Sequence, residues 1–124
     1  MAQNRKERFD EILRELRNSN SDIEGAVLVT PDGLLLANQI ASINGAAEKV
    51  AAVSASLLGL GKKVNATLEN GTFQELHLRG SERSTLLLDT GKALLTIIMK
   101  REANVGMVYI DARIAAEAIA QAFV

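Results

Sequence analysis

The side chains that could carry chemistry in this sequence are few and are not grouped in a catalytic spacing. His77 is the only histidine and the chain has no cysteine, so a metal site would need carboxylates around a single imidazole. Ser54, Ser56 and Ser84 stand outside any Gly-x-Ser-x-Gly turn, and the sole histidine limits any catalytic triad. We therefore interpret His77 as a surface histidine.

Two Gly-Lys pairs, Gly61-Lys62 and Gly91-Lys92, hint at phosphate-binding loops. A P-loop also needs a glycine five residues before the pair and a serine or threonine after it, because its backbone must wrap the phosphates. Neither pair meets these conditions. Glu24 and Asp32 are a carboxylate pair of the kind that could act as general acid and base, but solvated faces and helix pairs explain most acidic residues. The sequence thus predicts no catalytic, cofactor-binding or metal-ligating residue, and no enzyme.

Composition narrows the class of protein further. The 124 residues suffice for one core, and we expect a single domain over residues 1–124. The formal net charge of −1 and the 3% of aromatic residues argue against a nucleic-acid partner, which would require basic and stacking side chains. The charged N-terminal segment differs from a signal peptide, and no apolar run is long enough for a bilayer. A cytoplasmic location without membrane insertion is therefore expected.

Hydrophobic spacing predicts the elements that must position any site. Residues 5–17 repeat apolar side chains at helical spacing and predict an amphipathic first helix. Residues 23–29 and 34–37 predict two antiparallel strands joined by a tight turn. Pro31 and Gly33 suit that turn, because proline presets one backbone angle and glycine tolerates a positive φ.

The segment from Asn44 to Val64 predicts a long second helix with an unusual amount of apolar perimeter. Asn44 suits the N-cap, and Glu48 lies near the positive end of the helix dipole. Helical angles give the helix one bulky face, one small face and a third face that is only weakly polar. These faces comprise, in that order, Val50, Val53, Leu57, Leu60 and Val64; Ala47, Ala51, Ser54, Ala55 and Leu58; and Lys49, Ala52, Ser56, Gly59 and Lys63.

The remaining segments predict three more strands and a final helix. Residues 72–79 alternate, whereas 84–89 and 93–99 are apolar at successive positions, as expected for strands covered on both faces. Residues 104–122 predict the last helix, capped by Asn104. Its expected buried stripe is Met107, Ile110, Ile114, Ala118 and Ala122. The predicted fold class is α/β, a three-layer α-β-α sandwich around a five-stranded, mostly antiparallel sheet, in the order helix-strand-strand-helix-strand-strand-strand-helix.

The weakly polar third side of the second helix is the positive indication of function. A helix wedged between its own sheet and a neighbouring element would also explain it, but contiguous exposed apolar area usually marks an interface. Small side chains let two helix backbones approach closely, so the small face suits contact with a second copy. The strand over 72–79 should lie at a sheet edge, where another chain could complete its backbone hydrogen bonds. A symmetric dimer would cover both surfaces at once.

Four segments in this order resemble the Roadblock (dynein light-chain) domain family, in particular its prokaryotic MglB-type members. They are the strand 23–29, the turn and strand 31–37, the helix 48–61 and the segment 103–106. Their sequences are IEGAVLV, PDGLLLA, EKVAAVSASLLGLG and ANVG. No single segment is diagnostic, but the combination is fairly specific.

The resemblance implies a homodimer with the sheets joined edge to edge through the third strand and the second helices side by side. It also implies a small Ras-like GTPase as partner, docked on the paired helices, with this protein as regulator or scaffold. Family members typically supply no catalytic arginine, and Arg79 and Arg83 are not interpreted as arginine fingers. Helical angles and the edge strand then assign the site residues, and the two faces of the second helix could exchange their roles. The expected partner-binding residues are Lys49, Ala52, Ser56 and Lys63, and the expected dimer-interface residues are Ala51, Ser54, Ala55, Leu58, Phe73, Glu75 and His77.

Two other functions stay open. The chain could be a non-catalytic assembly subunit of a motor, a membrane-signalling complex or a histidine-kinase module, without effect on GTP turnover. It could instead be a small ligand-binding or hydrolytic domain, which a deep pocket with convergent polar groups would favour. A filled core beneath a flat helical platform would count against that last possibility.

Overall fold

The structure, a computed structural model, describes residues 3–40 and 46–124, and its elements follow the predicted order. The elements are α1 (Arg5–Ser19), β1 (Ile23–Val29), β2 (Leu35–Ile40), α2 (Ala46–Thr67), β3 (Glu75–Arg79), β4 (Arg83–Asp89), β5 (Leu94–Lys100) and α3 (Val105–Ala122). The predicted N-cap Asn44 lies outside the described residues. The cap of α3 is confirmed, because the Asn104 side chain accepts a hydrogen bond from the backbone N–H of Met107.

The five strands of the described chain form one antiparallel sheet in the order β2-β1-β5-β4-β3. β1 and β5 pair at its centre, where Leu28 lies opposite Leu95. β3 is an edge strand, which confirms the prediction for the third strand. β2 continues to Ile40, beyond the predicted end at Ala37, because its pairing with β1 extends as far as Gly25.

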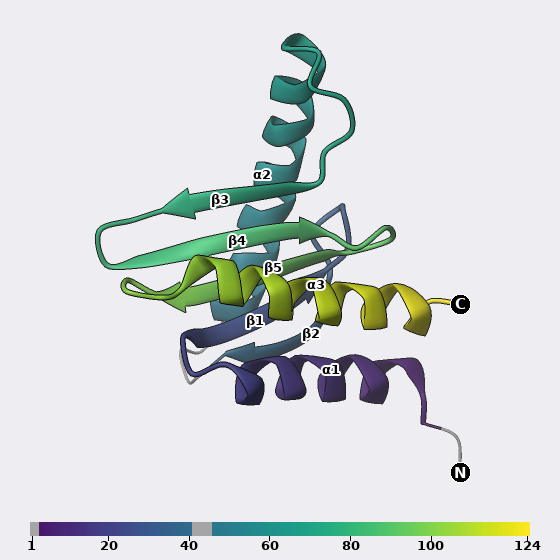
Figure 1. Cartoon of the computed structure of the whole chain (residues 1–124). Coiled ribbons are helices and arrows are strands. Elements are labelled where there is room, and N and C mark those ends of the chain that lie inside the picture. Colours follow the sequence, from purple (N-terminus) through teal and green to yellow (C-terminus); the bar gives the residue numbers. More distant parts are fainter. Residues whose placement is uncertain (1–2, 41–45) are drawn as a thin grey trace.

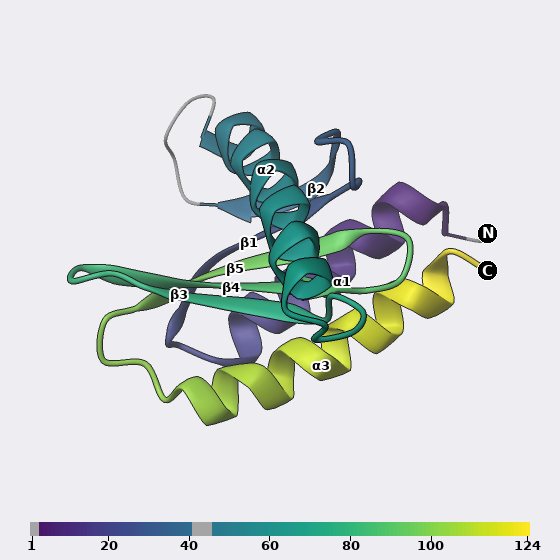
Figure 2. The same cartoon turned by 90° about the horizontal axis from the view of Figure 1, so that it is seen from above.

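Helices cover both faces of this sheet, which confirms the three-layer architecture. α1 and α3 lie side by side on one face and α2 crosses the other, and the last turns of α2 project beyond β3 (Figures 1 and 2). Leu28, Leu95 and Ile97 are fully buried in the core beneath α1 and α3. Val27 and Val29 are fully buried in the smaller core beneath α2. Successive residues of β1 therefore serve opposite cores, which explains the continuous apolar run over residues 26–29.

α3 buries smaller side chains than its sequence pattern suggests. The predicted buried stripe is wrong for Met107, Ile110 and Ile114, which are exposed. The helix packs instead through Val108, Ala112, Ala115, Ala116 and Ile119. Alanines let the helix approach the sheet closely, and the strands already fill the shared core with leucine and isoleucine side chains. The large residues of α3 consequently remain at the surface.

α2 shows the same arrangement on the opposite face of the sheet. Ala51, Ser54 and Leu58 of its small face are buried against the sheet, whereas Val53 and Leu60 of its bulky face are exposed. The prediction that Ala51, Ser54 and Leu58 make the self-contact is therefore wrong, because these side chains are already buried in their own subunit. The apolar surplus of the helix exists, but it lies on the bulky face.

The β1–β2 turn occupies one flank of α2. Gly33 adopts the positive φ predicted for this turn, at +96°, and a Cβ added to it would lie 3.5 Å from the Cβ of Ala55. Ala55, another expected self-contact residue, is half-buried on this side of the helix. The flank of α2 that faces the turn is thus occupied within the subunit, which leaves the opposite flank free.

Two glycines near the end of α2 should respond in opposite directions to alanine. A Cβ added to Gly59 meets nothing within 4 Å. Gly59→Ala should therefore raise the free energy of unfolding by about 0.5–1 kcal/mol through helix propensity. A Cβ on Gly61 would lie 2.6 Å from Cε2 of the buried Phe73. Gly61→Ala should therefore lower the free energy of unfolding by about 1–2 kcal/mol through overpacking.

Urea unfolding of the two alanine variants measures this difference, and Gly59→Ala is the matched control for helix propensity. Stabilisation of the protein by Gly61→Ala would contradict the packing of Phe73 beneath α2.

Candidate interaction surface

The exposed apolar flank of α2 is the strongest candidate for a functional surface. Val53, Leu60 and Val64 are 58%, 61% and 51% exposed, and Leu57 between them is half-buried. These four residues, called here the bulky flank, recur at helical spacing and form a continuous stripe along one side of the helix. Single exposed apolar residues are ordinary on a protein surface, but a contiguous stripe is typical of an interface.

The bulky flank borders a part of the sheet that α2 leaves open. α2 packs mainly on β1, β2 and β5, so the β4–β3 side of this face is largely uncovered. A hollow of about 240 Å³ lies there, between Val53 and Leu57 of the helix and Leu78, Thr85 and Ile98 of the sheet. Its lining is mostly apolar, and Leu78 on the edge strand is itself exposed. A second apolar surface of matching shape would fill this hollow between α2 and the sheet.

A buried pair of hydroxyls fixes the rotation of α2 on the sheet. Ser54 Oγ and Thr96 Oγ1 lie 2.7 Å apart, and both residues are buried. The hydrogen bond satisfies two polar groups that would each cost about 1–3 kcal/mol if left unpaired in this core. Because it ties the small face of α2 to β5, it also determines which sides of the helix face outward.

The residues predicted to bind a partner lie on the outward side of α2. Lys49, Ala52, Ser56 and Lys63, called here the platform stripe, are all exposed. The Ser56 hydroxyl donates a 3.2 Å hydrogen bond to the Ala52 carbonyl oxygen, so this side chain folds back along the helix. The middle residues of the platform stripe, Ala52 and Ser56, have short side chains, and a lysine stands at each end. That a partner binds there stays a prediction.

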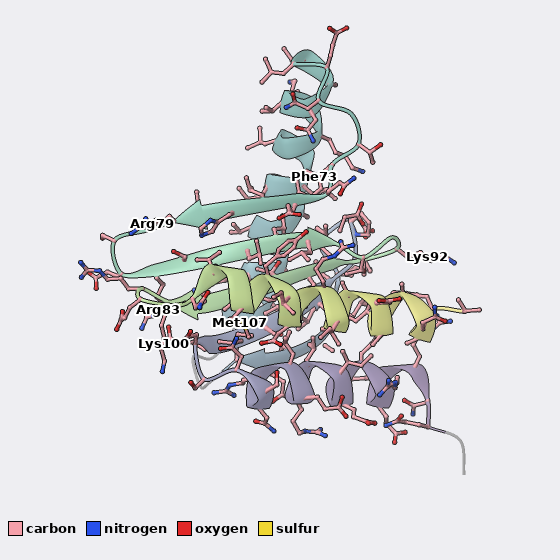
Figure 3. The ribbon with its side chains drawn as sticks, viewed as in Figure 1. Phe73, Arg79, Arg83, Lys92, Lys100 and Met107 are labelled. Carbon is pink, nitrogen blue, oxygen red and sulfur yellow. The ribbon has the colours of Figure 1, made fainter. Side chains whose placement is uncertain are left out.

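The edge strand β3 places only some of the expected interface residues at the surface. Glu75 and His77 are exposed, and their contact with a second copy stays a prediction. The prediction for Phe73 is wrong, because this residue precedes β3 and is buried beneath α2 beside Gly61 (Figure 3). The carboxylate of Glu75 accepts a 2.9 Å hydrogen bond from the Tyr109 hydroxyl, which links the edge strand to α3.

Tyr109 is the only tyrosine in a chain without tryptophan, so its ionisation can be followed by ultraviolet absorbance. The hydrogen bond to Glu75 raises the pKa of Tyr109 above its ordinary value, because the carboxylate favours the protonated phenol. Glu75→Ala is expected to lower the pKa of Tyr109 toward the ordinary value. Glu82→Ala, an exposed carboxylate outside this contact, is the control. An equal pKa in wild type and Glu75→Ala would contradict the hydrogen bond.

The same hydrogen bond makes stability depend on pH in a defined direction. A pKa that is raised by folding contributes stability that is complete below the ordinary pKa of tyrosine. This contribution is lost as the pH rises through the raised pKa of the folded state. The stability difference between wild type and Glu75→Ala should therefore diminish in alkaline solution.

The residues with catalytic potential are not brought together. His77 is exposed, and the described residues contain no group of three or more potential metal ligands. Glu24 lies near the start of β1 and Asp32 in the turn beyond its end, and the Glu24 carboxylate accepts a 2.9 Å hydrogen bond from Arg83 Nε. Arg79, the last residue of β3, is exposed on the other side of the β3–β4 turn from Arg83. Within residues 3–40 and 46–124, no helix has the length and apolar character needed to cross a membrane.

One hollow has features that fit the alternative of a ligand-binding domain. It has a volume of about 660 Å³ and lies where β1 and β5 meet the start of α2. Apolar residues such as Val50 and Ile98 form its floor, and Arg17 and Lys100 are charged residues of its lining. Arg83 also lines this hollow but is paired with Glu24. Its charged lining thus consists of Arg17, Lys100 and the Glu24–Arg83 ion pair.

The sequence could have identified the bulky flank but not its exposure. Its residues form one of the three faces that helical angles separate, so their mutual proximity follows from spacing alone. Which face meets the sheet depends on how much volume the strands contribute to the core, and that is a property of the packed structure.

Comparisons with known proteins agree with the observed fold. The family model of the Roadblock/LC7 domain matches residues 9–99. The uncharacterised protein MJ1340 of Methanocaldococcus jannaschii is 31% identical over 116 residues, which are 93% of this chain and 99% of that protein. A solved structure of MglB with a tetrameric arrangement is 25% identical, with a TM-score of 0.87 over 98% of this chain and 92% of its own. The gliding protein MglB of Thermus thermophilus is 23% identical and shares the fold, with a TM-score of 0.87 over 98% of this chain and 93% of its own.

Proposed function

Because the chain belongs to the Roadblock/LC7 family as a prokaryotic MglB-type member, we propose that it is a homodimeric regulator or scaffold that binds a small Ras-like GTPase. The family supports a regulator or adaptor role in general; the homodimer and the GTPase are the specific parts of the proposal. The observation that carries it is the free bulky flank of α2 beside an uncovered strip of sheet.

In the proposed dimer, two sheets meet through their β3 edges and the two α2 helices lie side by side. The bulky flank of each helix packs against its mate, and Leu78 lies at the foot of the contact. The self-contact thus moves from the small face to the bulky flank, while Glu75 and His77 keep their expected place at the edge. Such an interface is isologous, since both copies contribute the same patch.

The platform stripes of the two helices then form the outer surface on which the GTPase docks. Lys49 and Lys63 offer positive charge, while Ala52 and Ser56 allow a close approach. Binding shifts the GTPase toward one nucleotide state only if the affinities for the two states differ. The protein is proposed to hold its partner without supplying a catalytic arginine, and to have no enzymatic activity of its own.

The test is capture of small Ras-like GTPases from native lysate after loading with GDP or with a GTP analogue. The wild-type protein is expected to retain such a GTPase more strongly in one of the two nucleotide states than in the other. The double variant Lys49→Ala with Lys63→Ala should reduce capture several-fold while the mass of the dimer is unchanged. Lys92→Ala, an exposed lysine in the β4–β5 turn, is the matched control and should bind as wild type. If an intact dimer captures no GTPase in either nucleotide state, the proposal of a GTPase partner is excluded. The function as an assembly subunit then remains.

A further inference from the structure

A second apolar surface lies on the side of the sheet opposite to α2. Met107, Ile110 and Ile114 of α3 are 49%, 53% and 65% exposed and recur at helical spacing. Figure 3 shows Met107 near the start of this stripe. Because α2 and α3 cover opposite faces of the sheet (Figure 2), a dimer joined through α2 and β3 leaves the stripe uncovered.

The stripe borders a groove of about 240 Å³ between α1 and α3. Ile12 and Leu16 from α1 and Ile114 from α3 give it apolar walls. Its charged lining residues are both acidic, Glu15 and Asp111, and no lysine or arginine contributes to the lining. The groove is therefore apolar at its base and negative at its rim.

A second hollow on the other side of Ile114 extends the negative surface. It has a volume of about 400 Å³, and its charged lining residues are Asp89, Glu117 and Arg113. With two carboxylates in each hollow, four carboxylates and one guanidinium surround a single exposed isoleucine. None of the four carboxylates belongs to an ion pair within the described residues, where the pairs are Lys6–Asp10, Arg8–Glu11 and Glu24–Arg83.

The Asp111 carboxylate of the groove is held in place by a hydrogen bond. Asn20 Nδ2 donates a 2.9 Å hydrogen bond to Asp111 Oδ2, which fixes the carboxylate at the end of the groove. A positioned charge attracts a complementary side chain with less loss of side-chain entropy than a mobile one. The apolar base and the fixed negative rim together define the chemistry of the occupant.

We propose that the α1/α3 face docks a basic amphipathic helix of a partner protein. The apolar side chains of this helix seat on Ile12, Leu16 and Ile114, and its lysines or arginines approach Glu15 and Asp111. This is the helix-in-groove mode, with specificity set by charge complementarity. The same carboxylates repel an acidic segment at the groove.

The test uses the full chain and two synthetic peptides of about 18 residues, a length at which a helix is stable enough to bind. Both peptides carry leucine at helical spacing; one has lysine and the other glutamate at the flanking positions. Fluorescence anisotropy should show that the lysine peptide binds at least about tenfold more tightly, a difference of about 1.4 kcal/mol. Glu15→Lys should diminish the preference, because it leaves three carboxylates against two cations around Ile114, and Ile114→Ser should weaken binding of the lysine peptide. Leu34→Ser, at an exposed position beside the β1–β2 turn and outside both proposed interfaces, is the control and should leave peptide binding unchanged.

Equal affinity for the two peptides would overturn the proposal, as would an unchanged preference in Glu15→Lys. Light scattering could instead show that the chain has more than its monomer mass, and that Ile114→Ser but not Leu60→Ser restores the monomer mass. This result would assign the α1/α3 face to a second copy of the chain. That result would also overturn the proposal. None of these outcomes bears on the GTPase, whose proposed site depends on α2 alone.

Discussion

Replacing Val53 and Leu60 together by glutamate is expected to convert the proposed dimer into a folded monomer. Both side chains are exposed in the single chain, so the charges remain solvated there and cost little. In the proposed dimer, the same carboxylates would lie between two apolar flanks, where burial of each charge costs several kcal/mol. The dissociation constant should therefore rise by a factor of at least about 10³.

Light scattering coupled to size exclusion measures this change. The wild-type chain of 13.3 kDa should give twice its mass at micromolar concentration, and the double variant should give its single mass with an unchanged circular dichroism spectrum. Ala52→Glu places the same charge on the exposed platform stripe and should leave the dimer intact. A wild-type monomer, or a dimeric double variant, would exclude the bulky flank as the contact.

Ala51→Glu is expected to produce the largest loss of stability. Ala51 is 1% exposed and belongs to the core beneath α2 together with Val27 and Val29. A glutamate there adds overpacking of about 1–3 kcal/mol to the cost of burying a charge, several kcal/mol more. Since small domains are stable by only about 5–15 kcal/mol, much of the stability should be lost.

Thermal and urea unfolding compare this variant with Ala52→Glu, which adds the same side chain at the neighbouring exposed position. The control should stay within about 0.5 kcal/mol of the wild type, as surface substitutions usually do. A variant Ala51→Glu that unfolds like the wild type but is monomeric would restore the small face as the self-contact. The two substitution pairs thus separate folding from assembly on one helix.

The fold could be predicted from the sequence because several local signals agree. The doubly apolar β4 and β5 require cover on both faces, and the Pro31 to Gly33 segment defines the first hairpin. Asn104 marks the start of α3 through its capping side chain. Each of these signals depends on only a few neighbouring residues, so it can be interpreted without knowledge of tertiary packing.

The orientation of α2 and α3 could not be predicted in the same way. Helical angles separate the faces of α2 correctly, but they do not indicate which face meets the sheet. In α3, the bulk of Met107, Ile110 and Ile114 suggests burial, and the structure has the reverse. Beneath these two helices the strands contribute so much side-chain volume that a small helix face fits closely, whereas α1 packs through large residues such as Phe9 and Leu13.

The prediction for Phe73 is wrong for a different reason. The alternation of residues 72–79 includes this residue, but β3 begins only at Glu75. The chain turns before the strand, so the aromatic ring enters the core beneath α2 instead of following the strand.

The exposed position of the platform stripe follows from the same small-face packing that buries Ala51 and Ser54.

The part of α2 that projects past β3 (Figure 1) has a dynamic consequence. Lys62, Lys63, Val64, Ala66 and Thr67 are all exposed, so the final turns of this helix have little tertiary support of their own. Amides in such a segment open and exchange with solvent deuterium rapidly, whereas those around the buried Leu58 are protected. A neighbouring helix would slow that exchange. Deuterium uptake over residues 62–67 should therefore rise on dilution, so that the tip of one helix reports whether a companion is bound.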